Sequence, residues 1–126
     1  MKIPGRNILI VDDHISIREL IALLLSRQGH HCVTARSGAE ALSQLKRTRF
    51  DAIMRDIVMP EMDGVAFTRE IVSLCPQLPI MAMTAHGKEY TMETIIGAGA
   101  RDFIWKPFRI DEFIVRFNRM MGEQEI

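Results

Sequence analysis

The sequence predicts an α/β fold in which one parallel β-sheet is covered by helices on both faces. Short apolar segments alternate with helical patterns five times along the 126 residues, and this alternation is typical of parallel strands joined by crossover helices. The apolar segments are nearly continuous, which indicates strands that are buried on both faces. The length suits one hydrophobic core. Residues 1–126 are therefore expected to form a single domain.

The strands are predicted from the apolar segments themselves. They are expected at residues 7–12, 31–35, 51–56, 78–83 and 101–105. The first helix is predicted from apolar residues spaced as on one buried helix face, and these are Ile17, Leu20, Ile21 and Leu24. Gly29 is expected to end this helix. The stretch from Ser37 to Glu40 is typical of a capping box, which would begin the second helix.

The remaining three helices are predicted in the same way. The third is marked by Phe67, Ile71 and Leu74, and the fourth by Met92, Ile95 and Ile96. The stretch 97–100 is expected to be the C-terminal cap of the fourth helix, because it follows a helix and precedes a strand, the reverse of a dinucleotide-binding loop. The last helix has the clearest apolar stripe, which consists of Ile110, Phe113, Ile114, Phe117 and Met121.

Five strand–helix units with right-handed crossovers suit a flavodoxin-like (βα)5 three-layer sandwich with strand order 2-1-3-4-5. In this order the carboxyl ends of the first, third, fourth and fifth strands lie beside the ligand crevice. The polar residues at these ends are Asp12–Asp13, Asp56, Thr84 and Lys106. The topology therefore predicts that they converge at one edge of the sheet.

Three carboxylates and one ammonium in one crevice pose an electrostatic problem. Like charges at short distance raise each other's pKa unless a cation neutralises them. Taken alone, Asp12–Asp13 would also suit the positive end of a helix dipole, but a carboxylate at Asp56, after a central strand, needs a partner. Mg²⁺ prefers carboxylate and carbonyl oxygens and leaves room for phosphate oxygens. Because an Asp can also act as a nucleophile, the crevice is predicted to support phosphoryl transfer.

Four segments together resemble the receiver domain of bacterial response regulators, the chemotaxis-regulator-like domain of two-component systems. They are ILIVDD at 8–13, DAIMRDIVMPEMDG at 51–64, MTA at 83–85 and KPF at 106–108. Each segment alone is a weak signal. Their order and spacing over essentially the whole chain make the combination specific.

The resemblance implies a role for each site residue. Asp56 would be the phosphoacceptor, and Lys106 would contact the phosphoryl group. The implied ligands of Mg²⁺ are Asp12, Asp13, Asp56 and the backbone carbonyl of Val58.

The resemblance also implies a switch. A phosphoryl group adds a charge of about −1.5 to −2 and new acceptor oxygens. Thr84 would move to hydrogen-bond the phosphate and draw Phe103 inward, and Pro107 would follow a cis peptide bond. The readout would be a surface made by the fourth helix, fifth strand and fifth helix, which could also form a homodimer. The implied partners are a sensor histidine kinase and a downstream protein or output domain.

Such a domain catalyses only its own phosphotransfer and dephosphorylation, so the chain is not expected to be an enzyme. Two other functions fit parts of the same pattern. An Mg²⁺-dependent phosphohydrolase with an Asp nucleophile would need a second Asp two residues later, where this chain has Val58. A flavin-binding electron carrier would need a phosphate loop after the first strand, where Asp12–Asp13 would repel the phosphate. The sequence leaves open whether the domain stands alone.

Composition limits the remaining possibilities. The net charge is +0, with 16 basic and 16 acidic residues, which argues against direct nucleic-acid binding. The apolar runs are far shorter than the roughly 20 residues that cross a bilayer, and no signal peptide is recognisable. Cys32 and Cys75 are isolated, so they are expected to be reduced and buried, and His30–His31 is expected to be a surface turn. A cytoplasmic location is predicted.

Arg55 departs from the family pattern, which has an apolar or small residue immediately before the phosphoacceptor. Strand alternation points Arg55 beneath a helix, where a guanidinium needs a carboxylate or an exit to water. Our hypothesis from the sequence is that it reaches toward the crevice and pairs with an acidic residue near Asp12 or Glu61. Such a pair would alter metal affinity.

Overall fold

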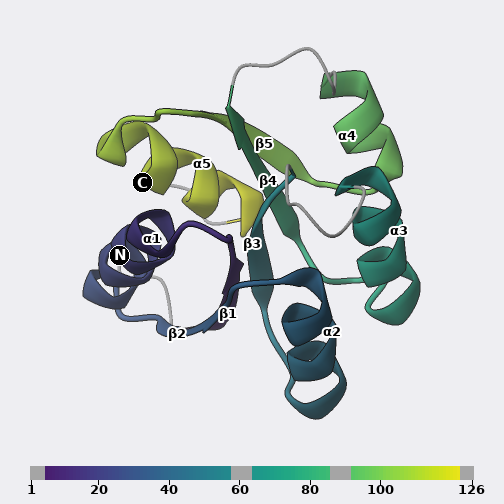
Figure 1. The fold of residues 1–126 in the computed structure, drawn as a ribbon. Helices are drawn as coiled ribbons and strands as arrows, with labels where there is room; N and C mark the ends of the chain where they lie inside the picture. Colours follow the sequence, from purple (N-terminus) through teal and green to yellow (C-terminus); the bar gives the residue numbers. More distant parts are fainter. Residues whose placement is uncertain (1–4, 58–63, 86–91, 123–126) are drawn as a thin grey trace.

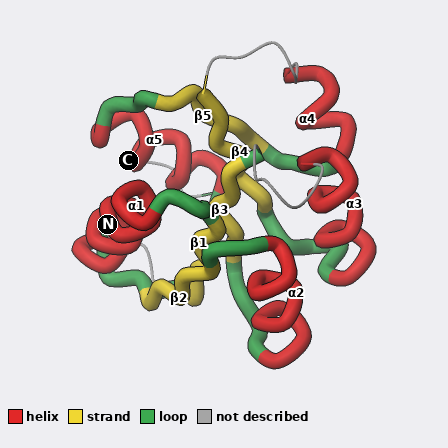
Figure 2. The backbone as a smooth tube through the Cα atoms, viewed as in Figure 1, coloured by secondary structure: helices red, strands yellow, loops and turns green. Residues whose placement is uncertain are grey.

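A computed structural model describes residues 5–57, 64–85 and 92–122 of the chain. Strands and helices alternate along it (Figures 1 and 2). The strands are β1 (Asn7–Val11), β2 (His31–Ala35), β3 (Ala52–Asp56), β4 (Ile80–Ala85) and β5 (Asp102–Lys106). The helices are α1 (Ile15–Arg27), α2 (Gly38–Arg47), α3 (Gly64–Leu74), α4 (Met92–Ala98) and α5 (Ile110–Met120).

The sheet has the order β2-β1-β3-β4-β5, and all of its pairings are parallel. Helices α1 and α5 cover one face, and α2, α3 and α4 cover the other (Figure 1). The predicted fold class is therefore confirmed. The register places Val11 opposite Arg55 and Asp56 opposite Met83, so the carboxyl ends of the central strands lie level with one another.

Each face of the sheet has its own hydrophobic core, because successive strand residues point to opposite faces. On β3, Ile53 packs with residues of α2, α3 and α4, such as Phe67. The next residue, Met54, packs with residues of α1 and α5, such as Phe117. This alternation decides which face the residues next to the site occupy.

The predicted strand positions agree well, apart from β4, which lies two residues further along the chain than expected. The Leu78 N–H donates to the Cys75 carbonyl at 3.1 Å in a turn, and pairing starts where the Pro79 carbonyl accepts from Ile53 N–H at 3.0 Å. Proline has no N–H to donate. Strand β4 therefore begins only after Pro79. It runs through Thr84 to Ala85, so its carboxyl end reaches the site edge.

The predicted helix caps are present. Ser37 Oγ accepts from the Glu40 N–H at 3.1 Å at the start of α2. At the end of α4, Ala100 N–H donates to Ile95 O at 3.3 Å and Gly99 N–H donates to Ile96 O at 3.0 Å, which is the Schellman pattern. Gly99 has a positive φ of 125° there, a conformation that glycine adopts without strain.

Five of the apolar residues from which the helices were predicted are instead exposed: Leu20 at 38%, Leu74 at 42%, Met92 at 50%, Ile96 at 40% and Ile110 at 54%. The buried face of α1 is centred on Ile21 and Leu25, and successive helix residues are about 100° apart, so Leu20 falls at its edge. In α5 the buried positions are Phe113, Phe117 and Met120. The predicted apolar stripes thus had the correct helical period but included residues beyond the buried face.

The prediction that His30 lies in a surface turn is wrong. His30 is 5% exposed and packs edge-on against Phe117 of α5, with ring centroids 5.2 Å apart. Its Nδ1 accepts from the Arg6 N–H at 3.2 Å. The neighbouring His31 is exposed. Cys32 and Cys75 are free and half-buried, and burial raises the pKa of the Cys32 thiol.

The burial of His30 predicts a pH dependence of stability. Burial, aided by Arg6, lowers the pKa of His30, although Asp51 acts in the opposite direction. The unfolded chain therefore takes up this proton more readily than the folded chain does. We expect the free energy of unfolding to be fully maintained above about pH 6.5 and to fall below it, by at most about 1.4 kcal/mol per pH unit. Denaturant unfolding of wild type and His30→Gln between pH 5 and 8 measures this, and parallel curves would contradict the prediction.

Within the described ranges, no helix combines the length and the apolar character that crossing a bilayer requires.

Candidate functional site

The site lies at the carboxyl edge of the sheet and is built on the ends of β1, β3 and β5. Lys106 Nζ lies 2.7 Å from Asp12 Oδ2 and 3.0 Å from Asp56 Oδ2. The ammonium on β5 thus bridges two carboxylates from two other strands. The topology brings these three side chains together because β1, β3 and β5 all end at this edge.

The carboxylates of this charged cluster are buried. Asp12 is 0% exposed and Asp56 is 4% exposed. Burial is the largest influence on the pKa of Lys106 and lowers it, but the hydrogen bond that Lys106 donates to Asp12 and the charges of Asp56 and Asp12 outweigh it and raise the pKa above its usual value. Lys106 is therefore a permanent cation at neutral pH, where it offsets the repulsion between the carboxylates.

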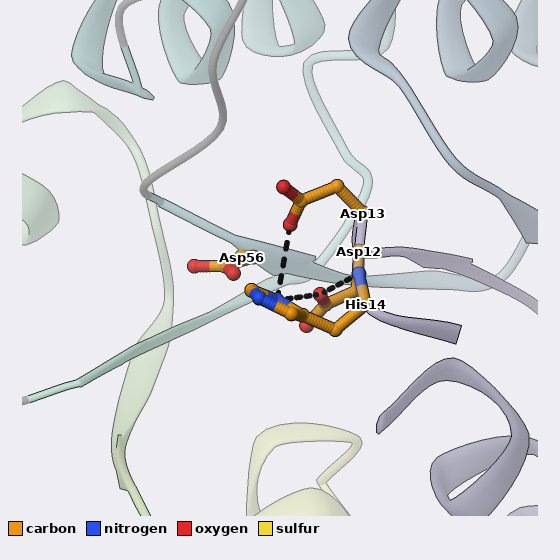
Figure 3. A group of neighbouring side chains, drawn as sticks. All are labelled: Asp12, Asp13, His14 and Asp56. Atoms are coloured by element: carbon orange, nitrogen blue, oxygen red, sulfur yellow. Dashed lines mark hydrogen bonds and ion pairs between the residues drawn. The ribbon is translucent and has the colours of Figure 1, made fainter. Parts of the chain in front are cut away.

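His14 is a member of the cluster that the sequence reasoning missed (Figure 3). Its Nδ1 lies 3.3 Å from Asp12 Oδ1 and 3.2 Å from Asp13 Oδ1, and its backbone N–H donates to Asp12 Oδ1 at 2.8 Å. One turn into α1, Arg18 Nη1 donates to the Asp12 carbonyl at 2.8 Å. The feature of the sequence that could have pointed to His14 was its position directly after Asp12 and Asp13, at the N-cap of α1.

The donor set fits a divalent cation. Ligand atoms of Asp12, Asp13, His14 and Asp56 all lie within 4.8 Å of one another. Three of the four are carboxylates, which suit a hard cation such as Mg²⁺. Asp13 Oδ1 is buried without a hydrogen bond among the described residues, and its contact with His14 is an ion pair only when the imidazole is protonated. Asp13 thus has capacity for a cation. Val58 lies outside the described residues.

Thr84 lies near the carboxyl end of β4, and Phe103 lies on the neighbouring strand β5. Thr84 is buried and pairs in register with Trp105. Phe103 is also buried, and its ring meets that of Trp105 edge-on at a centroid distance of 5.1 Å. The Lys106–Pro107 peptide bond is cis, as the resemblance implied.

The described contacts of Arg55 lie away from Asp12, one of the two regions in which the sequence hypothesis placed its partner. Arg55 is 1% exposed, so it does not reach water. Its Nη1 donates to the Gly64 carbonyl at 2.7 Å and to Thr68 Oγ1 at 2.8 Å, while its Nε donates to the Asp56 carbonyl at 3.0 Å. These contacts direct the guanidinium toward α3 rather than toward the Asp12 carboxylate. Glu61, the other suggested partner, lies outside the described residues.

A (βα)5 sheet with strand order 2-1-3-4-5, an acidic pocket and a bridging lysine defines a receiver-type signalling domain. The sequence-family model of the response regulator receiver domain matches residues 8–118. The chain belongs to this family.

Similar proteins include regulators of different lengths. The transcriptional regulatory protein ZraR of Salmonella typhimurium is 39% identical over 105 residues, which are 83% of this chain and 24% of that protein. The response regulator MprA of Mycobacterium leprae is 35% identical over 115 residues, 91% of this chain and 50% of that protein. The chain thus spans from about a quarter to half the length of these two relatives.

Among solved structures, the chemotaxis response regulator CheY4 of Vibrio cholerae aligns with a TM-score of 0.85 and 30% identity, covering 92% of this chain and 98% of that chain. Receiver domains are the phosphorylation-dependent signalling switches of two-component systems, and the family typically uses Mg²⁺. The family assignment made from the sequence motifs is confirmed.

Proposed function

We propose that Asp56 is the residue that accepts the phosphoryl group, delivered by a sensor histidine kinase, and that residues 1–126 act as one receiver domain. The observation that supports this most directly is the buried bridge from Lys106 Nζ to Asp12 and Asp56 at 2.7 and 3.0 Å. In the transfer, the bond between phosphorus and the donor nitrogen breaks, and a bond between phosphorus and Asp56 Oδ forms. Lys106 stays at the same carboxylate and faces the transferred charge.

Asp12, Asp13 and Asp56, with the carbonyl of Val58, would hold Mg²⁺. When bound, this ion supplies positive charge against the phosphoryl oxygens and screens the three carboxylates from one another. The protein's part is positioning. Lys106 holds the Asp56 carboxylate by a charge-assisted hydrogen bond, and the core residues on either side of β3 exclude water from the strand end.

The readout would follow from Thr84 and from the surface of α4, β5 and α5. Oxygens on a phosphorylated Asp56 favour the arrangement in which Thr84 donates to them, which biases an existing equilibrium of the neighbouring loops. A cavity of about 420 Å³ between α4, β5 and α5 is lined partly by the exposed Met92 and Ile96. We propose this surface for the downstream partner, or for a second copy of the chain.

No turnover of an external substrate is part of this proposal. The position two residues after Asp56 is Val58, which cannot serve as the general acid of a phosphohydrolase. Buried carboxylate at Asp12 likewise disfavours a flavin phosphate at the same edge. The domain is proposed to act in the cytoplasm, between kinase and output.

Fluorescence of Trp105, which directly precedes Lys106, tests this proposal. Titration with Mg²⁺ and then with beryllofluoride, a phosphoryl mimic, is expected to change the Trp105 emission in two saturable steps. The Asp56→Asn variant should lose the second step, because the mimic bonds to the carboxylate. An unresponsive wild type, or an undiminished second step in Asp56→Asn, would count against the proposed function.

A further inference from the structure

The guanidinium of Arg55 joins two segments of the chain that flank residues 58–63. On the β3 side, Nε and Nη2 both donate to the Asp56 carbonyl, and Nη2 also reaches the Ile57 carbonyl at 3.4 Å. On the α3 side, Nη1 donates to the Gly64 carbonyl at 2.7 Å and to Thr68 Oγ1 at 2.8 Å. One planar group therefore holds the end of β3 and the first turn of α3 together.

The Thr68 hydroxyl completes the hydrogen-bond network of Arg55 on α3. Thr68 Oγ1 accepts from Arg55 and donates to the Gly64 carbonyl at 2.8 Å, so its hydroxyl is used in both directions. The guanidinium carbon also lies 4.7 Å from the centre of the Phe67 ring, within the range of a cation–π contact. Contacts with Gly64, Phe67 and Thr68, all near the start of α3, thus orient the guanidinium plane.

A second, independent feature brings the same two segments into contact. A Cβ atom added to Gly64 would lie 2.3 Å from the Ile57 carbonyl oxygen and 2.7 Å from Ile57 Cγ2. Only glycine permits this approach of backbone to backbone. The two ends of the 58–63 segment therefore touch directly at Ile57 and Gly64, and Arg55 spans the same junction.

A cation at this place carries costs that an apolar side chain would not. A buried guanidinium carries a large desolvation cost, and the N-terminal end of a helix disfavours positive charge. An apolar side chain would avoid both costs. It would also lose the donors that fix the Asp56 and Ile57 peptides relative to α3.

We infer that Arg55 is a positioning residue: it fixes the backbone on both sides of the Asp56 carboxylate by clamping the end of β3 to the first turn of α3. This inference rests on the proposed role of Asp56. It extends that role by assigning to α3, through Gly64 and Thr68, the task of holding the phosphoacceptor and the neighbouring Mg²⁺ ligands in place.

The test compares Arg55→Met, Arg55→Lys and a matched control, Ile71→Val. Methionine keeps the unbranched apolar stem and removes the donors, and lysine keeps the charge but not the planar fork. Ile71 is buried one turn further along α3, so its truncation perturbs the helix without touching the clamp. Three quantities are measured: hydrogen exchange of the metal-free protein at Ile57 and the first turn of α3, the Kd for Mg²⁺, and the phosphorylation rate at saturating Mg²⁺.

We expect Arg55→Met to speed exchange at these amides about tenfold and to weaken Mg²⁺ binding about tenfold. Arg55→Lys should resemble Arg55→Met, and Ile71→Val should keep the wild-type Kd. Unchanged exchange and Kd in Arg55→Met, or full rescue by lysine, would overturn the inference. A Kd shift in Ile71→Val as large as that of Arg55→Met would do so too.

A milder variant covers the case in which Arg55→Met does not fold. Thr68→Val removes the hydroxyl that links Arg55 to Gly64, and it should speed exchange in the first turn of α3; wild-type exchange there would overturn the inference. Failure of the proposed function is separately recognisable. If Asp56→Asn were still phosphorylated, the phosphoacceptor would be another residue, while the exchange data on metal-free protein would still decide what Arg55 holds.

Discussion

Replacing Asp56 with Asn is expected to abolish phosphorylation by a small-molecule phosphodonor such as acetyl phosphate in the presence of Mg²⁺. The amide lacks the nucleophilic carboxylate oxygen on which the phosphoryl group would be received. Intact-protein mass spectrometry, with and without Mg²⁺, measures the phosphorylated fraction. Wild-type protein should gain one phosphoryl group that is lost on treatment with base, as an acyl phosphate is.

The matched control is Asp51→Asn, which changes the same residue type just before the other end of β3. Asp51 Oδ2 accepts from the Asn7 N–H at 2.8 Å, far from the carboxyl edge of the sheet. Its phosphorylated fraction should equal that of wild type. Phosphorylation that survives in Asp56→Asn, or that is lost in Asp51→Asn, would refute the assignment of Asp56.

Replacing Lys106 with Met is expected to have the second large effect, on both stability and reactivity. Asp12 and Asp56 would lose their shared ammonium at 2.7 and 3.0 Å while staying buried. Removing one partner of a buried pair typically costs about 3 kcal/mol, and loss of a preorganised cation slows the reaction roughly a hundredfold. Lys106 has a raised pKa, so its stabilisation is complete at neutral pH and is lost only above about pH 10.5.

Mg²⁺ provides a sharper readout of Lys106→Met than stability alone. Because the carboxylates would lack their internal cation, Mg²⁺ should raise the Tm of Lys106→Met by more than it raises that of wild type. Lys46→Met, at an exposed position of α2, controls for the loss of one positive charge. An equal Mg²⁺ effect on Lys106→Met and Lys46→Met would show that Lys106 does not neutralise the site.

Topology explains why much of the site could be predicted from the sequence. Asp12, Asp56 and Lys106 each follow an apolar strand, and parallel strands end at the same edge of a sheet. Once the strand order was inferred, their proximity needed no knowledge of side-chain packing. The same reasoning predicted that Thr84 lies at this edge, although β4 begins two residues later than expected.

The features that escaped prediction depend on details that residue patterns do not encode. His14 joins the cluster because the N-cap backbone of α1 turns its imidazole toward Asp12 and Asp13. The acceptors of Arg55 include the carbonyls of Asp56 and Gly64, and every residue has a carbonyl. The burial of a polar side chain by a distant helix is equally hidden, as α5 covering His30 illustrates.

The cap of α4 has a consequence for how this sequence can change over evolutionary time. A Cβ atom at Gly99 would lie 2.4 Å from Cγ2 of Val72 on α3. The two positions therefore share one volume, in addition to the left-handed backbone that already favours glycine at 99. A smaller residue at 72 would remove the contact but not the backbone strain at 99, so the glycine is expected to persist whatever residue α3 carries at 72.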